Sequence, residues 1–158
     1  LFQGSALYDS MTVRENLEFP LRRHISKFGN VKDTLPLVEE ALQNVGLKNV
    51  INLMPNELSG GMKRRVALAR TLILKPKIII YDEPTTGLDP ITSKEIILLM
   101  KSVQEKYKTS SIIITHDVDC ARVIANRMIL LIDGKNYAEG TFAKLSTSED
   151  PKVKAFFK

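Results

Sequence analysis

Hydrophobic residues change their spacing along this chain, and the changes mark where helices and strands are expected. Thr12 and Glu15 stand three residues apart beside an apolar run, which predicts a helix that begins with a capping box and ends at Pro20 or soon after it. Apolar residues then recur at helical spacing over residues 35–45, and Gly46 is expected to end that helix. The first third of the chain is therefore predicted to be mainly helical.

Short apolar runs without a helical period predict strands in the second half of the chain. Residues 78–82 and 112–115 are typical of parallel strands that are buried on both faces, so helices are expected on either side of the sheet. Residues 127–132 predict a further strand, and Asp133-Gly134 predicts a tight hairpin turn into residues 136–139.

Helices are also expected before, between and after these strands. Helical spacing or capping residues mark the ranges 59–72, 94–106 and 150–158. Helices that alternate with parallel strands predict an α/β fold.

The composition narrows the class of protein. The chain has 158 residues, of which 44% are hydrophobic, and this is enough for a packed core. No apolar run approaches the ~20 residues that a membrane-spanning helix needs. Cys120 is the only cysteine, which excludes an internal disulfide and fits a reducing cytosol, and we expect it to pack as a small hydrophobic side chain. The net charge of +5 is spread along the chain, so no nucleic-acid partner is expected.

Two carboxylates, Asp82 and Glu83, follow the first predicted strand directly. Open α/β sheets bind their ligands at the carboxyl ends of strands, and neighbouring residues of a strand point in different directions. One carboxylate could hold a hydrated Mg²⁺, and the other could orient or deprotonate a water that attacks a phosphate. Taken alone, a solvated strand end explains the pair equally well.

A second candidate site lies at the start of the helix predicted over residues 59–72. Ser59 is a favoured N-cap, and Gly60 and Gly61 let backbone N–H groups approach an anion without a Cβ in the way. The positive end of the helix dipole faces that anion. An ordinary capped helix is the alternative interpretation of these three residues by themselves.

Together, the motifs resemble those of ATP-binding cassette (ABC) ATPases. The run LSGGMKRR (58–65) resembles the signature motif of this family. The run IIIYDEPTTGLDP (78–90) resembles the Walker B motif and the D-loop, and IIITHD (112–117) resembles the switch-histidine strand. Gln3 and the residues after it resemble the Q-loop, although the LFQG opening could also be the scar of a protease-cleavable tag. Met62, where the family usually has glutamine, makes the chain similar to the ATPases of Mce-type phospholipid transporters, as do the QGSALYDS and EDPKV runs.

The resemblance implies roles in hydrolysis for four residues. Asp82 would hold Mg²⁺, and Glu83 would be the general base. Gln3 would reach the Mg²⁺ and the attacking water, and His116 would sense the γ-phosphate.

The resemblance also implies contacts across a dimer. Ser59, Gly60 and Gly61 would bind the γ-phosphate of an ATP held mainly by the opposing subunit. Asp89 in the D-loop would communicate between the two subunits.

The implied fold is the P-loop NTPase-like three-layer sandwich of ABC ATPases with a helical signature subdomain. The helical subdomain would occupy about residues 9–74, the Walker B half of the core about 75–145, and a C-terminal tail 146–158. The sequence contains no Gly-x-x-x-x-Gly-Lys-Ser/Thr loop, which cradles nucleotide phosphates. In ABC ATPases this Walker A loop precedes the Q-loop, so we expect the chain to be the incomplete, C-terminal portion of such a domain, with little ATPase activity of its own.

The implied function is that of an ABC transporter subunit, which couples the hydrolysis of ATP, with Mg²⁺, to transport, here of phospholipids. Its partners would be a second ATPase subunit, arranged head to tail, and transmembrane permease subunits that hold it on the cytoplasmic face of the membrane. Two alternatives stay open: a soluble ABC-type ATPase in translation or DNA repair, and a non-catalytic interaction fragment.

Overall fold

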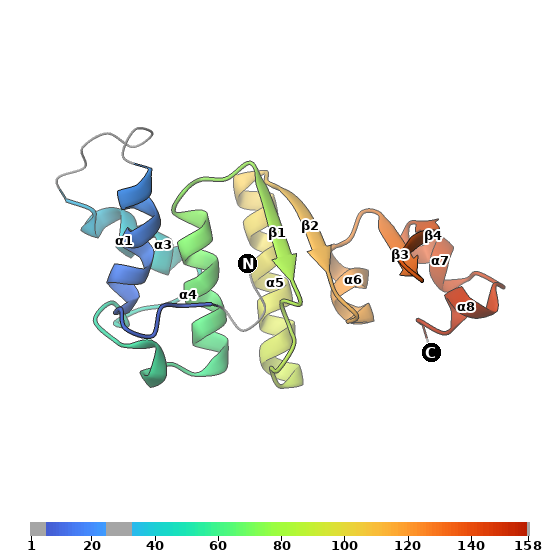
Figure 1. Cartoon of the computed structure of the whole chain (residues 1–158), viewed down its shortest axis with the longest axis horizontal. Helices are drawn as coiled ribbons and strands as arrows, with labels where there is room; N and C mark the ends of the chain where they lie inside the picture. Colours follow the sequence, from blue (N-terminus) through green and yellow to red (C-terminus); the bar gives the residue numbers. More distant parts are fainter. Residues whose placement is uncertain (1–5, 25–32, 158) are drawn as a thin grey trace. The chain divides into compact units, whose positions relative to one another are not determined.

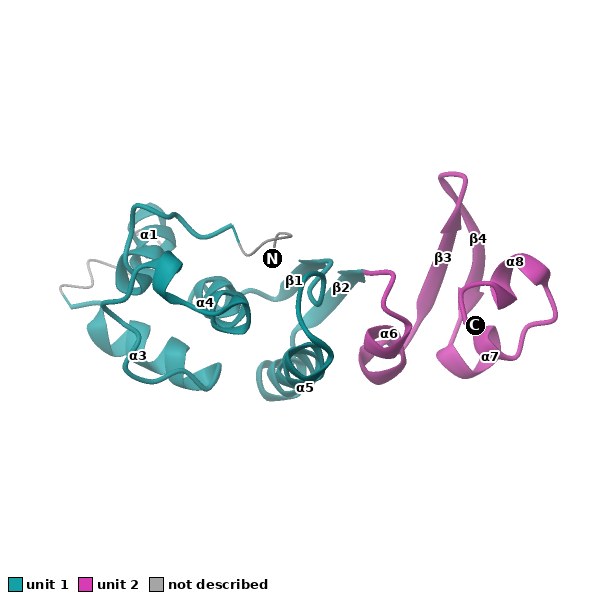
Figure 2. Ribbon diagram, turned by 90° about the horizontal axis from the view of Figure 1, so that it is seen from below, with its two compact units in different colours: residues 1–114 teal, residues 115–158 magenta. Residues whose placement is uncertain are grey.

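The computed structural model describes residues 6–24 and 33–157. The chain forms two compact units, residues 1–114 and 115–158, and each is described by itself (Figure 2). These units are defined by compactness and do not test the subdomain boundaries that the resemblance implies, which stay a prediction. Gln3 lies outside the described residues.

Three helices form the first part of unit 1. They are α1 (Val13–Arg23), α3 (Leu35–Asn44) and α4 (Gly60–Leu72), and a short 3₁₀ helix (Pro55–Glu57) precedes α4. The predicted capping box is confirmed, because Thr12 Oγ1 accepts from Glu15 N at 3.2 Å and Glu15 Oε2 accepts from Thr12 N at 2.8 Å. The helix continues past Pro20 to Arg23, although Pro20 has no N–H to donate.

These three helices pack against one another and enclose an apolar core (Figure 1). Each helix buries the side chains of one stripe, as helical spacing predicts. The fully buried core side chains of this bundle include Val13, Leu17, Val38, Val66, Ala69 and Leu68. Gly46 follows α3 with a φ of 72°, a conformation that favours glycine, and so confirms the predicted helix end.

A parallel strand pair forms the rest of unit 1. Strands β1 (Ile78–Asp82) and β2 (Ser110–Ile114) pair in parallel, with Ile80 opposite Ile112. Helix α5 (Pro90–Tyr107) lies along one face of the pair (Figures 1 and 2). The side chains buried on this side are Ile79, Tyr81, Ile96, Ile97, Met100 and Val103.

The opposite face of the pair is exposed in the described chain. Ile78 and Ile80 alternate with buried residues of β1, and Ile112 and Ile114 alternate with half-buried residues of β2. Each of these four side chains is about half exposed, from 49% at Ile114 to 60% at Ile78. The prediction that helices cover both faces was therefore wrong for the described residues. The apolar runs indicate that both faces of the strands need to be covered, but they do not indicate which segment covers the second face.

Unit 2 holds a short helix, an antiparallel hairpin and two further helices. They are α6 (Val118–Ile124), β3 (Met128–Ile132), β4 (Lys135–Gly140), α7 (Phe142–Ser146) and α8 (Pro151–Lys154). The predicted turn is confirmed, with positive φ at Asp133 and Gly134. Sequence analysis missed α6 and α7, although Asp117 and Thr141 are N-caps that could have signalled them.

A small core holds unit 2 together. Leu130, Leu145 and Val153 are each at least 94% buried and cluster with partly buried neighbours such as Phe157. Cys120 is fully buried, as predicted.

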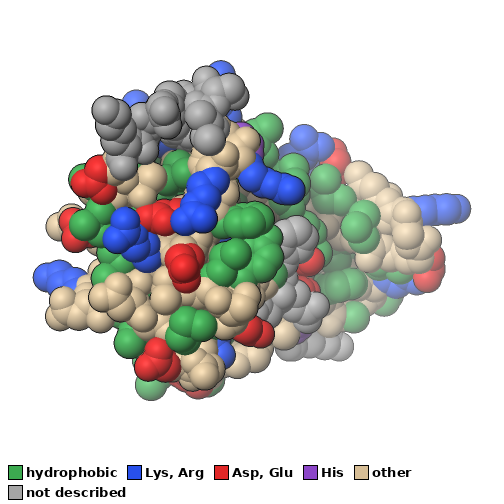
Figure 3. Space-filling view, turned by 60° about the vertical axis from the view of Figure 1, so that its left-hand side comes forward, with side chains coloured by type: hydrophobic (Ala, Val, Ile, Leu, Met, Phe, Trp, Pro, Cys, Tyr) green, Lys and Arg blue, Asp and Glu red, His purple; other side chains and the backbone are tan. Residues whose placement is uncertain are grey.

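Glu18 of α1 provides a test of stability against pH. Its carboxylate is almost buried and accepts from Thr34 Oγ1 at 2.6 Å, Arg14 Nε at 2.7 Å and Arg22 Nη2 at 3.1 Å. Burial alone would raise the pKa of Glu18, but these hydrogen bonds outweigh burial and leave the pKa below its ordinary value. Acidic and basic side chains also lie close to one another on the face of the molecule that Figure 3 shows.

A carboxyl with a lowered pKa in the folded state stabilises the fold above its unfolded pKa, and this stability is lost as pH falls through the folded pKa. We therefore expect Glu18→Gln to cost on the order of 1 kcal/mol at pH 7, and the cost to shrink below about pH 4. Urea unfolding at pH 7 and pH 3.5 measures both, and Glu39→Gln, at an exposed position of α3, is the control. An equal cost at both pH values would show that the charge of Glu18 is not what stabilises the helix.

Candidate functional site

Glu83 is fixed at the carboxyl end of the β1–β2 pair. Its N–H donates to the Ile114 carbonyl at 2.9 Å, which extends the ladder one residue past β1. Its φ is +46°, a left-handed conformation that costs a non-glycine residue about 1–2 kcal/mol. Such conformations persist where the surrounding structure imposes them, and they cluster at functional sites. Asp82, the preceding residue, is exposed, whereas Glu83 is half-buried.

The Glu83 carboxylate is oriented by the segment that follows it. Thr86 Oγ1 donates to Glu83 Oε2 at 2.9 Å. The Thr86 carbonyl in turn accepts from Arg64 Nη2 of α4 at 3.1 Å. Arg64 is buried, and burial lowers the pKa of its guanidinium. A chain of hydrogen bonds thus links the helix that begins at Ser59 to the carboxylate at the strand end.

Sequence analysis did not single out Arg64 or Thr86. Arg64 lies about one turn after Gly60 and Gly61 on a helix whose other buried residues are apolar. A charged residue in that stripe was the available signal, since arginine is rarely buried unless it has a partner.

The N-terminus of α4 is capped and its first residues are exposed. Ser59 Oγ accepts from Met62 N at 3.2 Å, which confirms the predicted N-cap. Ser59 and Gly60 are exposed to solvent, and the first N–H groups of a helix have no partner within it. The arrangement can therefore receive an anion at the positive end of the helix dipole.

Gly60 and Gly61 also allow close packing against the segment after Glu83. A Cβ on Gly61 would lie 2.7 Å from Thr92 Cγ2 of α5, and a Cβ on Gly60 would lie 3.4 Å from Leu88 Cδ2. The contact at Gly61 is shorter than any ordinary carbon–carbon contact. The structure thus brings the start of α4 against the predicted D-loop and the first turn of α5.

Asp89 caps α5. Its Oδ1 accepts from Ile91 N and Thr92 N, both at 3.0 Å. The hydrogen bonds from the Thr92 side chain and backbone lower the pKa of this exposed carboxyl. This structural role accompanies the predicted communication across a dimer, which stays a prediction.

His116 lies in unit 2, in the short connection between β2 and α6, and its side chain is exposed. The connection is ordered by local hydrogen bonds: Asp117 N donates to Thr115 Oγ1, and Asp117 Oδ1 accepts from Cys120 N, both at 3.0 Å. The role of His116 as a γ-phosphate sensor stays a prediction.

Asn16 and Arg70 hold the segment that follows Gln3. The fully buried amide of Asn16 donates to the carbonyls of Tyr8, Met11 and Thr12 at 3.0–3.1 Å, and its Oδ1 accepts from Tyr8 N at 2.9 Å. Arg70 of α4 donates to Asn16 Oδ1 at 3.3 Å and to the Ala6 carbonyl at 2.8 Å. This connection between α4 and the start of the described chain was not foreseen from the sequence.

Among the described residues, no group of three or more His, Cys, Asp or Glu side chains is placed to hold a metal ion. Mg²⁺ bound beside a nucleotide takes most of its ligands from phosphates and water, and needs only one or two protein carboxylates. The exposed Asp82 at the strand end fits that requirement.

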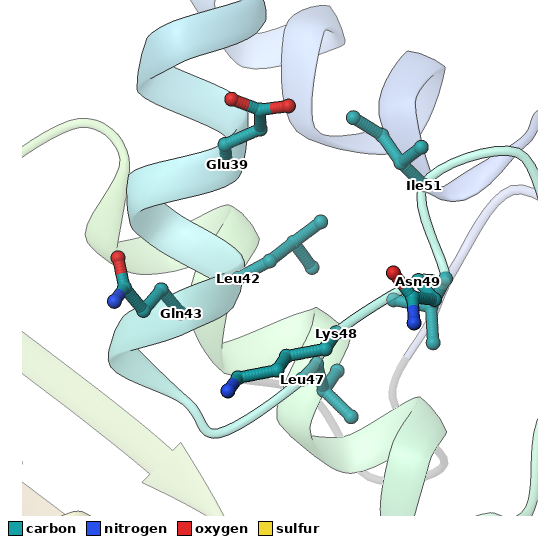
Figure 4. Close-up of a pocket in the computed structure, with 8 residues that line it drawn as sticks. Glu39, Leu42, Gln43, Leu47, Lys48, Asn49 and Ile51 are labelled. Carbon is teal, nitrogen blue, oxygen red and sulfur yellow. The ribbon is translucent and has the colours of Figure 1, made fainter.

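A pocket of about 290 Å³ lies elsewhere in unit 1 (Figure 4). Glu39, Leu42 and Gln43 of α3 line one side, and the connection over residues 47–51 lines the other. The residues predicted from the motifs do not line it. Among the described residues, no helix is both long and apolar enough to cross a membrane.

Gly61 allows a test of the contact between α4 and α5. We expect Gly61→Ala to destabilise unit 1, because the new Cβ meets Thr92 Cγ2, and overpacking typically costs about 1–3 kcal/mol. The double variant Gly61→Ala/Thr92→Ser, which removes that methyl group, should recover most of the loss. Thermal unfolding of the two single variants and the double variant measures the coupling, and strictly additive effects would contradict the contact.

Comparisons with known proteins agree with the motifs. The family model described as ABC transporter matches residues 1–86. The chain is 41% identical over its whole length to the intermembrane phospholipid transport system ATP-binding protein MlaF of Haemophilus influenzae and covers 59% of that protein. It is 38% identical to the chloroplastic protein TRIGALACTOSYLDIACYLGLYCEROL 3 of Arabidopsis thaliana, with 99% of the chain and 49% of that protein covered.

A solved structure shows the same architecture. The ATP-binding cassette MJ0796, in a dimeric post-hydrolysis state bound to ADP and Pi, superposes with a TM-score of 0.76 at 34% identity, covering 89% of this chain and 61% of that one. The chain thus spans about half to three-fifths of the length of the relatives it matches.

Proposed function

Since the chain belongs to the ABC transporter family, we propose that it forms part of an ATP-binding subunit whose hydrolysis of ATP drives transport across a membrane. The observation that carries the proposal is the chain of hydrogen bonds from Arg64 through Thr86 to Glu83. It couples the helix that begins with the signature glycines to the carboxylate at the strand end.

We assign Glu83 the role of general base. Its carboxylate stands at the carboxyl end of a parallel strand, where α/β sheets bind ligands, and Thr86 Oγ1 holds one of its oxygens. A carboxylate oriented in this way can accept a proton from water as it attacks the γ-phosphate. The positive φ of Glu83 sets the direction in which this side chain leaves the strand, and its N–H stays bonded to the Ile114 carbonyl.

Asp82 would hold Mg²⁺, whose chemistry when bound is to neutralise phosphate charge. His116 and Gln3 would attend the γ-phosphate and the water. Ser59, Gly60 and Gly61 would bind the γ-phosphate of ATP held by a second subunit, so the working form is a head-to-tail dimer. The solved relative MJ0796 is itself dimeric, and Asp89 would lie at such an interface.

We further propose that the transported molecule is a phospholipid and that permease subunits hold the protein on the cytoplasmic face of a membrane. The support is the name of the relative of 41% identity, an ATP-binding protein of an intermembrane phospholipid transport system. Met62 and the resemblance to Mce-type ATPases point the same way.

The test uses the full-length protein, purified together with the permease subunits that the proposal requires and placed in lipid vesicles. We expect Mg²⁺-dependent ATP hydrolysis and ATP-dependent transfer of a labelled phospholipid to acceptor vesicles. Hydrolysis without lipid transfer would reject the phospholipid and keep the ATPase. Absence of hydrolysis by the intact complex would reject the ATPase itself and favour an interaction module.

A further inference from the structure

A second pocket, of about 390 Å³, lies at the amino ends of β1 and β2, the opposite end of the strands from Asp82 and Glu83. It lies between the connection that leads from α4 into β1 and the connection that leads from α5 into β2. Its lining residues are Leu72, Lys75, Pro76, Lys77, Tyr107, Lys108, Thr109 and Ser110.

The charge of this pocket is positive. Three of the eight lining residues are lysines, and none is acidic. The helices α4 and α5 both end here, and each contributes about half a negative charge at its carboxyl end. Three ammonium groups exceed these two half charges and the nearby carboxylate of Glu40, which leaves a balance of about +1. Glu40 of α3 acts on the lining residue Tyr107, whose pKa is raised by burial first and by the Glu40 charge second.

Thr109 supplies a hydroxyl group that the described residues leave without a partner. Its side chain is 93% buried, and Oγ1 makes no hydrogen bond to any described residue. Buried polar atoms are hydrogen-bonded in the large majority of cases, and an exception calls for an explanation. Thr109 lines the pocket, so a rotation about its Cα–Cβ bond would bring the hydroxyl to a ligand that accepts a hydrogen bond there.

The backbone around the pocket is already held by hydrogen bonds. Ser110 N donates to the Lys77 carbonyl at 3.0 Å, which ties the two connections together. Lys75 N donates to the Leu72 carbonyl at 2.8 Å and turns the chain back after α4. Backbone groups that are already paired do not have to reorganise when a ligand binds, and this lowers the cost of binding.

We propose that this pocket binds a phosphate-bearing anion, held by Lys75, Lys77 and Lys108 and by a hydrogen bond from Thr109 Oγ1. Lysine is a common phosphate ligand as a point charge, and a hydroxyl donates to a phosphate oxygen. The site is separate from the predicted hydrolysis site at the other end of the same strands. The phosphate group can belong to a soluble anion or to a lipid headgroup, and the experiment distinguishes the two.

The first experiment titrates the full-length protein with inorganic phosphate, or with sodium chloride at matched ionic strength, and follows backbone amide resonances by NMR. We expect saturable shifts at residues 75–77 and 108–110 with phosphate and not with chloride. Lys75→Gln/Lys77→Gln/Lys108→Gln should weaken binding by about tenfold, since partly exposed charges each contribute a small part. Lys94→Gln/Lys101→Gln/Lys135→Gln removes the same charge at other exposed positions and should change affinity less than about twofold.

A second arm uses phosphatidylcholine vesicles with and without phosphatidic acid. Sedimentation with the phosphatidic acid vesicles, lost in the first triple variant and kept in the control triple variant, assigns the site to a lipid headgroup. Phosphate shifts without such sedimentation assign it to a soluble anion. The proposal would be overturned if phosphate caused no saturable shifts and the phosphatidic acid vesicles caused no sedimentation. Equal losses of binding in both triple variants would overturn it as well.

Thr109→Val separates binding from folding. Valine keeps the shape of threonine and removes the hydroxyl, so without phosphate we expect the variant to unfold at the same temperature as the parent or higher. With phosphate present, the parent should gain more thermal stability than the variant. An equal gain in both proteins would show that the hydroxyl does not contact the anion.

Discussion

Replacing Glu83 by glutamine in the full-length protein should lower the rate of ATP hydrolysis about 10²–10⁴-fold while ATP still binds. The amide keeps the shape of the carboxylate but cannot take a proton from water. Thr86 Oγ1, which donates to Glu83 Oε2 at 2.9 Å, can donate to the amide oxygen as well. The strand end should therefore keep its structure, so that the change removes the base and leaves the fold intact.

Phosphate release at saturating ATP measures the rate, and size-exclusion chromatography measures the dimer. The variant should accumulate as an ATP-bound dimer, because hydrolysis no longer separates the subunits. Glu95→Gln, the same replacement at an exposed glutamate paired with Arg65, should hydrolyse ATP at nearly the parent rate. Unchanged hydrolysis by Glu83→Gln would show that another group is the base.

Replacing Asn16 by leucine should cost about 3 kcal/mol or more of the free energy of unfolding. Asn16 is fully buried and makes hydrogen bonds to Tyr8, Met11 and Thr12. Leucine has nearly the same size but cannot replace these bonds, and each buried group left without a partner costs ~1–3 kcal/mol. The loss also frees residues 6–12, which follow the predicted Q-loop.

Urea unfolding gives the free energy, and chymotrypsin cleavage after Tyr8 reports the local loosening. Asn56→Leu, the same replacement at an exposed position of the 3₁₀ helix, should leave both measurements close to those of the parent. If the two variants behave alike, the hydrogen bonds of Asn16 do not hold the segment.

The elements of the fold that depend on local chemistry could be predicted from the sequence. The capping box at Thr12, the N-cap at Ser59 and the turn at Asp133-Gly134 each follow from side chains within a few residues. The buried face of α5 follows from apolar residues at helical spacing. The parallel pairing of β1 with β2 does not follow from local chemistry, because nothing in an isolated strand specifies its neighbour.

The connections between distant segments could not be predicted in this way. The hydrogen bond from Arg64 to Thr86 joins residues 22 positions apart, and that from Arg70 to Ala6 spans 64. The positive φ of Glu83 results from how the segment after β1 is held by β2 and α4, so a rule based on residue type alone would have favoured glycine there. Such features depend on which surfaces meet, and this information is spread over the whole chain.

During protein synthesis, two processes compete for the exposed isoleucine face of β1 and β2: folding within one polypeptide and association between copies. A segment of the same polypeptide would cover this face at a rate that does not depend on concentration, whereas another newly made copy would reach it at a rate that rises with concentration. Isoleucine-rich strands with an open edge are prone to the second outcome. Slow, dilute expression should therefore give more correctly assembled protein than rapid expression, and the gain should be lost when Ile112 and Ile114, both exposed, are replaced by threonine.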